Sequence, residues 1–458
     1  MSEGAVRILL ISTYELGHQP FGLASPAALL RADGHEVICV DLAVDSWPPE
    51  VVEAADIIGF YLPMHTATRL ALPVIAHLRA RNRRAHLVCY GLYAPPNEAL
   101  LRRLGVRTIL GGEFEPALRR LAGGELDGKE TLVSHERFAF LKPDRHGLPP
   151  LNRYAALLVN GTRKIAGYTE ASRGCKHWCR HCPVVPIYRG RFRVVPVEIV
   201  LADIRAQVEA GAEHISFGDP DFFNGPGHAV RVAEALHREF PSLTYDVTIK
   251  IEHLLRHADL LALLRRTGCL FITSAAESLD DAVLARLRKG HTRADFLEAV
   301  RRVRAAGLEL APTFIPFTPW TTWESYRELL RVVAEQDLVA NVAPIQFALR
   351  LLIPAGSLLL ELDEVRRQVG PFDEAGLAWR WRHSDASLDE LAREVFRLVA
   401  SEQHQGRSRP EIFARIWERA YGAAPAEAPS RGQRAAIPHL EEPWYCCAEP
   451  AEGQTILL

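Results

Sequence analysis

The feature that most constrains this chain is a regular alternation of short apolar strands and amphipathic helices. Between residues 166 and 360 a strand is followed by a helix six times. Strands joined through helices lie parallel, because each helix returns the chain to the same edge of the sheet. Six units predict an α/β fold built as a partial (β/α)6 TIM-type barrel, since a closed barrel has eight. The predicted barrel strands are residues 165–172, 213–219, 243–250, 270–276, 308–317 and 343–352.

Residues 1–125 show the same alternation in shorter units and predict a doubly wound, flavodoxin-like domain. Residues 126–165 are rich in turn-forming residues and predict a linker. Residues 361–421 carry helical periodicity and predict a helical C-terminal region. Residues 422–458 begin as an Ala/Pro-rich linker and predict a flexible tail. The predicted strands of the first domain are residues 6–12, 35–42, 55–62, 85–91 and 107–112.

Composition and charge exclude several partner classes. The 458 residues carry a formal net charge of −2, so no strong field attracts nucleic acid or an anionic membrane. No apolar run approaches the ~20 residues that a membrane-spanning helix needs. The first residues, MSEGAVRILLIS, lack the basic start and cleavage site of a signal peptide. We therefore expect a cytoplasmic protein without nucleic-acid or membrane partners, in which thiols stay reduced.

Three cysteines follow the first predicted barrel strand. Cys175, Cys179 and Cys182 have the spacing C-x3-C-x2-C, in a loop on the barrel face that carries chemistry. A reduced cysteine cluster indicates metal binding or catalysis rather than a disulfide. A four-iron cluster takes cysteine thiolates as its usual ligands, so three thiolates leave one iron open. The alternative is a tetrahedral zinc site with His177 or His181 as the fourth ligand.

The stretch EASRGCKHWCRHCPV…RGRFRVVPVE resembles the radical S-adenosylmethionine (SAM) proteins that carry an N-terminal cobalamin-binding-type domain. The resemblance covers most of residues 1–360, with the same domain order. It implies a 4Fe–4S cluster on the three cysteines, with SAM bound at the open iron. An electron from the reduced cluster then cleaves a carbon–sulfur bond of SAM, so the resemblance also implies an electron donor such as flavodoxin or ferredoxin. His181 departs from the family, which often has an aromatic residue before the last cysteine.

The resemblance implies SAM contacts where the barrel strands end. Gly218 gives the backbone close approach, and Asp219 or Asp221 accepts from the SAM ammonium group. Glu277 resembles the ligand of the ribose hydroxyls, and Lys250 is a candidate partner of the SAM carboxylate. The structural alternatives are a turn for the two aspartates, a helix cap for the glutamate and a solvated surface for the lysine.

Three further candidates end the last two predicted strands. Ile315 and Phe317 occupy the place where the superfamily stacks adenine against apolar side chains, and core packing is the alternative. Arg350 offers a guanidinium fork to a carboxylate of SAM or substrate. A structural ion pair is the alternative for this arginine.

The first domain lacks one element of the cobalamin proteins that it resembles. Their motif DxHxxG follows the first strand and supplies a histidine to cobalt. Here the loop reads TYELGHQPFG, so His18 is present without the acid-x-His spacing. We therefore predict a scaffold or a lid rather than a histidine-ligated cobalamin site, while cobalamin held without a histidine stays open. A cobalamin-dependent radical SAM methyltransferase is the alternative function.

The tail carries the motif WYCCAEP, with Cys446 and Cys447 adjacent. Adjacent thiols chelate soft ions and form only a strained disulfide. The tail resembles a radical SAM group named for its CCAEP or CUAEP ending, in which selenocysteine aligns with Cys447; this implies a nucleophilic or redox role. We predict a radical SAM enzyme that acts on a small molecule or a soft element, with these thiols as redox or substrate-capturing groups. A zinc or metalloid sensor is the non-enzyme alternative.

Overall fold

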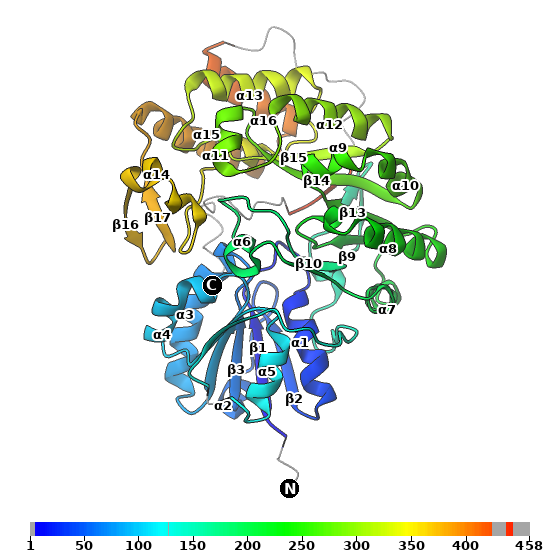
Figure 1. The fold of residues 1–458 in the computed structure, drawn as a ribbon, viewed down its shortest axis with the longest axis vertical. Helices are drawn as coiled ribbons and strands as arrows, with labels where there is room; N and C mark the ends of the chain where they lie inside the picture. The colour runs from blue at the N-terminus through cyan, green and yellow to red at the C-terminus, as the bar shows by residue number, and fades with distance from the viewer. Residues whose placement is uncertain (1–4, 127, 424–436, 443–458) are drawn as a thin grey trace.

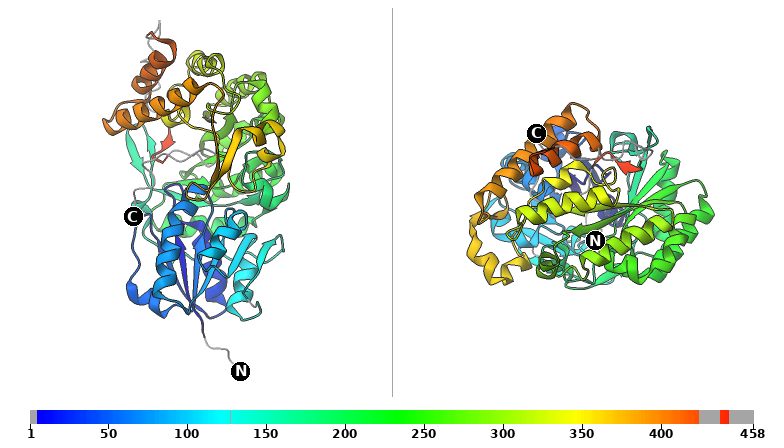
Figure 2. Two further views of the ribbon diagram at one scale, coloured as in Figure 1. Left: turned by 90° about the vertical axis from the view of Figure 1, so that its left-hand side faces the viewer. Right: turned by 90° about the horizontal axis from the view of Figure 1, so that it is seen from above.

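The computed structural model describes residues 5–126, 128–423 and 437–442. An N-terminal α/β domain lies below an open barrel, and helices from the C-terminal part cover the top (Figure 1). Figure 2 shows the same stacking from the side. Among the described residues, no helix combines the length and apolar character that crossing a membrane requires.

The N-terminal sheet has six parallel strands in the order β2-β1-β3-β4-β5-β6. Its two faces are both buried: along β1, Leu9 and Ile11 join one apolar cluster while Ile8 and Leu10 join the other. Burial on both faces explains the continuous apolar runs in the sequence and confirms the doubly wound prediction. The strands are β1 (Arg7–Ser12), β2 (Glu36–Asp41), β3 (Ile57–Tyr61), β4 (His86–Tyr90), β5 (Thr108–Gly112) and β6 (Thr131–Ser134).

Helices cover both faces of this sheet: α1 (Phe21–Ala32), α2 (Pro49–Ala54), α3 (His65–Arg81), α4 (Glu98–Arg103) and α5 (Glu115–Ala122). Strand β6 is an addition, because it lies in the stretch 126–165 that we expected to be a linker. It is a four-residue strand at the edge of the sheet, and none of its residues is fully buried. A strand that is not buried does not need a continuous apolar run, so the sequence carries no signal for it. The stretch 126–165 therefore contains regular structure at β6, and also at β7 (Leu157–Val159) and β8 (Thr162–Lys164).

The barrel is a five-stranded parallel sheet in the order β15-β14-β13-β12-β9. Its strands are β9 (Ala166–Thr169), β12 (His214–Phe217), β13 (Thr244–Thr248), β14 (Cys269–Glu277) and β15 (Glu309–Phe314). The sixth predicted strand, 343–352, is present only in part. Its first half forms a 3-10 turn at Pro344–Phe347, where proline cannot donate to a strand ladder. Its second half pairs in parallel with Phe317 through an isolated bridge at Arg350, with backbone hydrogen bonds from Phe317 to Leu349 and from Leu351 to Phe317.

The helices of the barrel alternate with these strands. They are α6 (Val184–Tyr188), α7 (Val197–Glu209), α8 (Pro226–Glu239), α9 (Ile251–Arg256), α10 (Leu261–Arg266), α11 (Asp281–Leu287), α12 (Arg293–Ala305) and α13 (Trp323–Glu335). In sequence, α6 follows the cysteine loop directly. The loop itself leaves β10 (Ser172–Gly174), which pairs antiparallel with β11 (Phe192–Val194).

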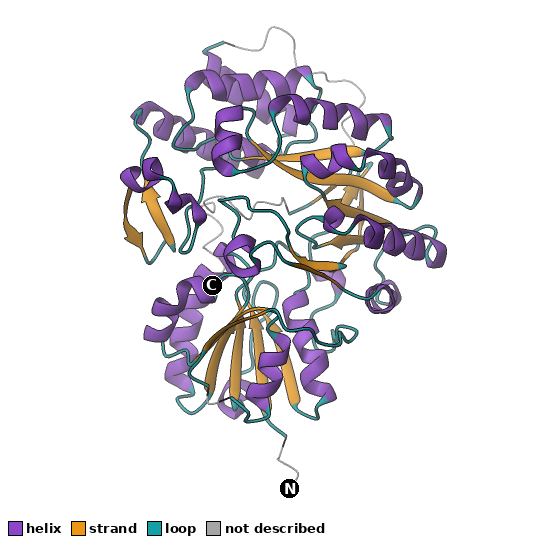
Figure 3. Ribbon diagram, viewed as in Figure 1, coloured by secondary structure: helices purple, strands orange, loops and turns teal. Residues whose placement is uncertain are grey.

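Residues 361–421 are mainly helical, as predicted, with α14 (Asp363–Gln368), α15 (Ala386–His404) and α16 (Arg409–Tyr421). They also contain an unpredicted hairpin of β16 (Val369–Asp373) and β17 (Ala378–Trp381), which stands apart from the two main sheets (Figure 3). Gly370 and Pro371 interrupt the first of these strands in sequence, which hid the strand pattern.

The chain end returns to the start of the barrel. Strand β18 (His439–Leu440) pairs antiparallel with β7 (Leu157–Val159), which also pairs with β8 (Thr162–Lys164). The Glu441 carboxylate accepts from the Ala156 amide and pairs with Arg163. The tail cysteines Cys446 and Cys447 lie outside the described residues.

A buried arginine joins the two domains. Arg173 on β10 is 6% exposed and donates to Glu115 at 2.6 Å, to Glu170 at 2.8 Å and to Ser25 at 3.0 Å. A second carboxylate of the first domain, Glu113, lies 3.5 Å away. The guanidinium also lies near the rings of Phe21, Phe114 and Phe140. This one side chain therefore connects α1, α5 and the loop that carries the cysteines.

We expect Arg173→Met to lower the free energy of unfolding by about 3–5 kcal/mol, because it leaves buried carboxylates without their cation. Thermal and urea denaturation measure the loss. The control is Arg103→Met, which removes an ion pair to Glu374 whose partners are 53% and 58% exposed. We expect the control to cost less than about 1 kcal/mol. Equal small losses in both variants would contradict a special role for Arg173.

Candidate active site

A cavity of about 290 Å³ opens where the strand ends of the two domains face one another. This volume is close to the lower end of the range for small-ligand sites. Loops after β1, β3, β4 and β5 line it from the first domain, and loops after β9, β12, β13 and β14 line it from the barrel. Both parallel sheets thus present to one space the carboxyl ends at which α/β proteins bind ligands.

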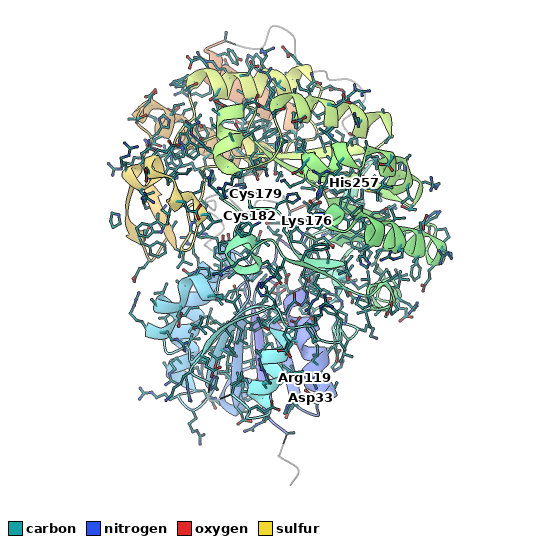
Figure 4. The ribbon with its side chains drawn as sticks, in the orientation of Figure 1. Asp33, Arg119, Lys176, Cys179, Cys182 and His257 are labelled. Carbon is teal, nitrogen blue, oxygen red and sulfur yellow. The ribbon has the colours of Figure 1, made fainter. Side chains whose placement is uncertain are left out.

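The three cysteines of the loop all line this cavity, as predicted from their spacing. Figure 4 labels Cys179 and Cys182 between the two domains. Gly174 starts the loop with a φ of +72°, and a side chain there would meet Tyr188 at 2.4 Å, so the turn requires glycine. Burial raises the pKa of Cys175 to about 12 and also raises the pKa of Cys179. Burial thus favours the neutral thiols, and a metal bound to them would favour the thiolates.

The spacing of the ligand atoms disfavours a single zinc ion. Thiolates on one tetrahedral zinc lie about 3.8 Å apart, given Zn–S bonds of about 2.3 Å. Among the described residues, no three Cys, His or carboxylate ligand atoms that include two of the loop cysteines lie within 4.8 Å of one another. His181 instead directs Nε2 to Glu277 at 3.0 Å, and His177 directs Nδ1 to Lys250 at 3.2 Å. The donor set fits a larger cluster better than it fits zinc.

Four of the predicted SAM-binding residues line the cavity: Gly218, Asp219, Lys250 and Glu277. Asp219 accepts from the Ala171 amide and the Ser172 hydroxyl, and burial raises its pKa to about 7. Its carboxylate therefore also supports the loop that leads to the cysteines.

Glu277 behaves differently from Asp219. It lies at a β-bulge in β14 with a φ of +66° and accepts from Lys289 at 3.3 Å. Burial opposes ionisation, but the Lys289 ammonium and the His181 hydrogen bond lower the pKa of Glu277 to about 2. A non-glycine residue in the left-handed region is strained, which is typical of functional sites. Glu277 is thus a fixed anion at the cavity wall.

Asp221 does not line the cavity, against our expectation. It is fully buried, with its Oδ2 atom 2.6 Å from Nδ1 of His253 and 3.4 Å from Nε2 of His177. Its other oxygen accepts from the Phe223 amide and caps a 3-10 turn. Asp221 therefore lies against two histidines, one of which, His177, belongs to the cysteine loop.

Ile315, Phe317 and Arg350 also lie outside the cavity. Strand β15 ends at Phe314, so the two apolar residues fall beyond it: Ile315 packs in an apolar cluster, and Phe317 stacks on Tyr326 at 4.9 Å. Arg350 pairs with Asp389 at 2.5 Å, and its guanidinium lies 4.1 Å from the centre of the Trp381 ring. In this structure the three side chains make the apolar and ionic contacts that we named as structural alternatives.

Several cavity residues escaped the sequence reasoning. They are contributed by the first domain, the first barrel strand, the helix α11 terminus and the returning chain end: Glu15, His18, Tyr61, Tyr168, Glu170, Lys289, Leu440 and Glu442. None has a local spacing signal, because they meet only through long-range packing. The acidic Glu170 directly before ASRGC was the nearest to a readable cue.

The structure also shows where the histidine of the first loop lies. His18, in the loop after β1, stacks on Tyr168 of the barrel with 4.6 Å between ring centroids and 26° between planes. This contact holds the His18 ring against the barrel at the wall of the cavity. The cavity also reaches the strand ends of the first domain, where Gly91, Leu92 and Gly112 line it.

Comparison with known proteins agrees with this geometry. Residues 169–333 match the family model described as the radical SAM superfamily. The ribosomal protein uS12 methylthiotransferase RimO of Porphyromonas gingivalis is 27% identical over 192 residues, which cover 38% of this chain and 42% of that protein. The hopanoid C-3 methylase of Methylococcus capsulatus is 26% identical over 344 residues, 66% of this chain and 62% of that protein. The chain thus spans less than two thirds of either relative.

Two solved structures share the fold over most of the chain. The cobalamin-dependent SAM radical enzyme OxsB, with aqua-cobalamin bound, has a TM-score of 0.65 at 16% identity and covers 87% of this chain and 67% of its own. The radical SAM methyltransferase TsrM from Kitasatospora setae, with tryptophan and a SAM analogue bound, has a TM-score of 0.59 at 18% identity, covering 80% and 78%. Residues 169–333 are therefore a radical SAM domain, and the chain as a whole shares its fold with cobalamin-dependent radical SAM enzymes.

Proposed function

We propose that the chain is a radical SAM enzyme whose reaction takes place in the cavity between the two domains. The observation that carries the proposal is the convergence of Cys175, Cys179 and Cys182 on one cavity, at a spacing too wide for one zinc ion. These thiols would hold a 4Fe–4S cluster, the family's cofactor. Such a cluster supplies the electron that cleaves a carbon–sulfur bond of SAM. The substrate is a small molecule or a soft element.

The residues around the cavity have distinct tasks in this proposal. Gly218 makes room for the Tyr168 side chain at the cavity wall, because a Cβ atom there would lie 1.9 Å from the Tyr168 hydroxyl. Lys250, held by Glu252 at 3.3 Å, offers an ammonium group to the SAM carboxylate. Glu277, ionised by Lys289, is suited to accept hydrogen bonds from ribose hydroxyls. Apolar rings from both domains exclude water from the same space.

The proposal predicts a selective loss of iron. Cys175→Ala, Cys179→Ala and Cys182→Ala should each lower bound iron and acid-labile sulfide several-fold after anaerobic reconstitution, because a cluster with two protein ligands is poorly held. Cys89→Ala is the control, since Cys89 is fully buried in β4 away from the cavity. Iron and sulfide analysis gives the result. Stoichiometric zinc without sulfide in the wild-type protein would instead support the sensor alternative.

We further propose that the tail thiols act in this cavity. Leu440 and Glu442 line it, and the Tyr14 hydroxyl donates to the Glu442 carboxylate. Cys446 follows Glu442 by four residues, and four extended residues span at most about 14 Å. The thiols of Cys446 and Cys447 are therefore within reach of the space beside the cluster loop. Their chemistry suits either reduction of a radical intermediate or capture of a soft element.

Deletion of the residues after Pro443 should abolish product formation and leave cluster assembly intact. The double variant Cys446→Ser/Cys447→Ser should reproduce the loss, because it removes the thiols without shortening the chain. Mass spectrometry of SAM-derived products, with and without arsenite, measures the effect, and the iron content is the control. Wild-type product formation by the double variant would contradict a chemical role for the tail.

A cobalamin-dependent methyltransferase is the second candidate. The reach of the cavity to the strand ends of the first domain favours it, as does the fold shared with cobalamin-bound proteins. Because the loop after β1 lacks the DxHxxG spacing, we expect a bound cobalamin to be held without ligation by His18. Purification with hydroxocobalamin tests this candidate: retained corrinoid with the same absorption spectrum in wild type and His18→Ala supports it, and an absence of corrinoid excludes it.

A further inference from the structure

Beside the cysteine loop, the chain exposes two large aromatic side chains among basic residues. Trp178 is 48% exposed and Phe192 is 36% exposed, and both belong to the small set of large apolar side chains at the described surface. Arg189 and Arg191 are exposed, and Lys176 is half-buried. We refer to Lys176, Trp178, Arg189, Arg191 and Phe192 as the loop patch.

The members of the loop patch lie together. The Trp178 ring packs on Gly190, where a side chain would begin only 2.8 Å from Nε1 of the indole. The Lys176 ammonium lies 5.8 Å from the centre of the Phe192 ring. Figure 4 labels Lys176 together with Cys179 and Cys182, between the domains. Trp178 is covalently next to Cys179, so the patch begins one residue from a cluster ligand.

The loop patch is positively charged, although the chain as a whole has a slightly negative net charge. Besides burial, the charges of Arg191, Arg193 and Arg189 lower the pKa of the neighbouring His135. No ion pair joins Arg189 or Arg191 to a carboxylate within the described ranges. The whole chain has a formal net charge of −2. The basic surface is therefore local, and two of its arginines are available to a partner.

We propose that the loop patch is the docking surface of a small acidic electron-transfer protein, of the flavodoxin or ferredoxin kind. The inference rests on the proposed function, since the partner's reduced centre loses one electron and the cluster gains it. Exposed aromatic rings with flanking arginines are the usual anchors of protein interfaces. Opposite charges speed the encounter and orient the partner. Docking here brings the donor against Trp178, the residue directly before Cys179.

Basic residues with aromatic rings also suit single-stranded nucleic acid. Two observations favour the electron-transfer protein: the patch adjoins a predicted cluster ligand, and the chain as a whole carries no excess positive charge. The test is therefore designed to separate the two partners.

The test uses the reconstituted full-length protein and a purified flavodoxin as the probe. The variants are Arg191→Glu, Arg189→Glu and Trp178→Ala. The control is Arg84→Glu, an exposed arginine before β4, at the sheet edge that faces away from the barrel. Calorimetry measures the binding of oxidised flavodoxin. Stopped-flow absorption measures cluster reduction by flavodoxin hydroquinone, and separately by dithionite and by reduced methyl viologen, which have opposite charges.

We expect the three loop-patch variants to bind flavodoxin at least tenfold more weakly and to be reduced by it at least tenfold more slowly. For the loop-patch variants, the mean of the reduction rates with dithionite and with methyl viologen should stay within about twofold of wild type, because the opposite charges of these reductants cancel simple charge effects. For Arg84→Glu, flavodoxin binding and all reduction rates should stay within about twofold of wild type. Wild-type binding and reduction in all variants would overturn the proposal. Loop-patch variants that are slowed equally with every reductant would also overturn it. So would variants that still bind flavodoxin but no longer bind a single-stranded RNA probe. A failure of the proposed function is distinct, because the wild-type protein would then show no cluster absorption before any donor is added.

Discussion

The arrangement of this molecule depends on one buried charge cluster, in which Arg173 of the barrel meets Glu113 and Glu115 of the first domain and Glu170 of its own strand end. Buried carboxylates are costly unless a cation lies beside them. The two domains are therefore stabilised in the relative orientation that places Arg173 among these carboxylates. The first cysteine follows Arg173 by two residues. The contact that fixes the domains relative to each other therefore also fixes the start of the cysteine loop.

From this contact follows the shape of the cavity. Each domain has its parallel strand ends on one side, and the arginine cluster holds these two sides face to face. The first domain thus supplies a wall of the cavity, through Glu15, His18 and Tyr61. The returning segment 437–442 adds another wall through Glu442. Side chains of the first domain and of the returning segment thus line the same cavity as the cysteine loop.

Most strands and helices could be predicted because the spacing of apolar residues that defines them is visible in the local sequence. The two-sided burial of β1 and the spacing of the cysteines are both visible along the chain. Phe317 and Arg350 are residue types that serve a ligand or a core equally well, so the sequence could not tell that both lie away from the cavity. Pro344 indicated that the sixth strand would be short. His18 and Lys289 carry no local signal, because their place in the cavity comes from contacts between distant segments.

The central claim is that the three cysteines hold a cluster with an iron open to SAM in the cavity between the domains. The most direct measurement is anaerobic. The reconstituted, reduced protein is incubated with SAM, its electron paramagnetic resonance spectrum is recorded with and without SAM, and the SAM fragments are identified by mass spectrometry. The account predicts a 4Fe–4S signal that changes when SAM is added, followed by 5′-deoxyadenosine or methylthioadenosine. A reduced cluster whose signal ignores SAM, with SAM recovered intact, would contradict it.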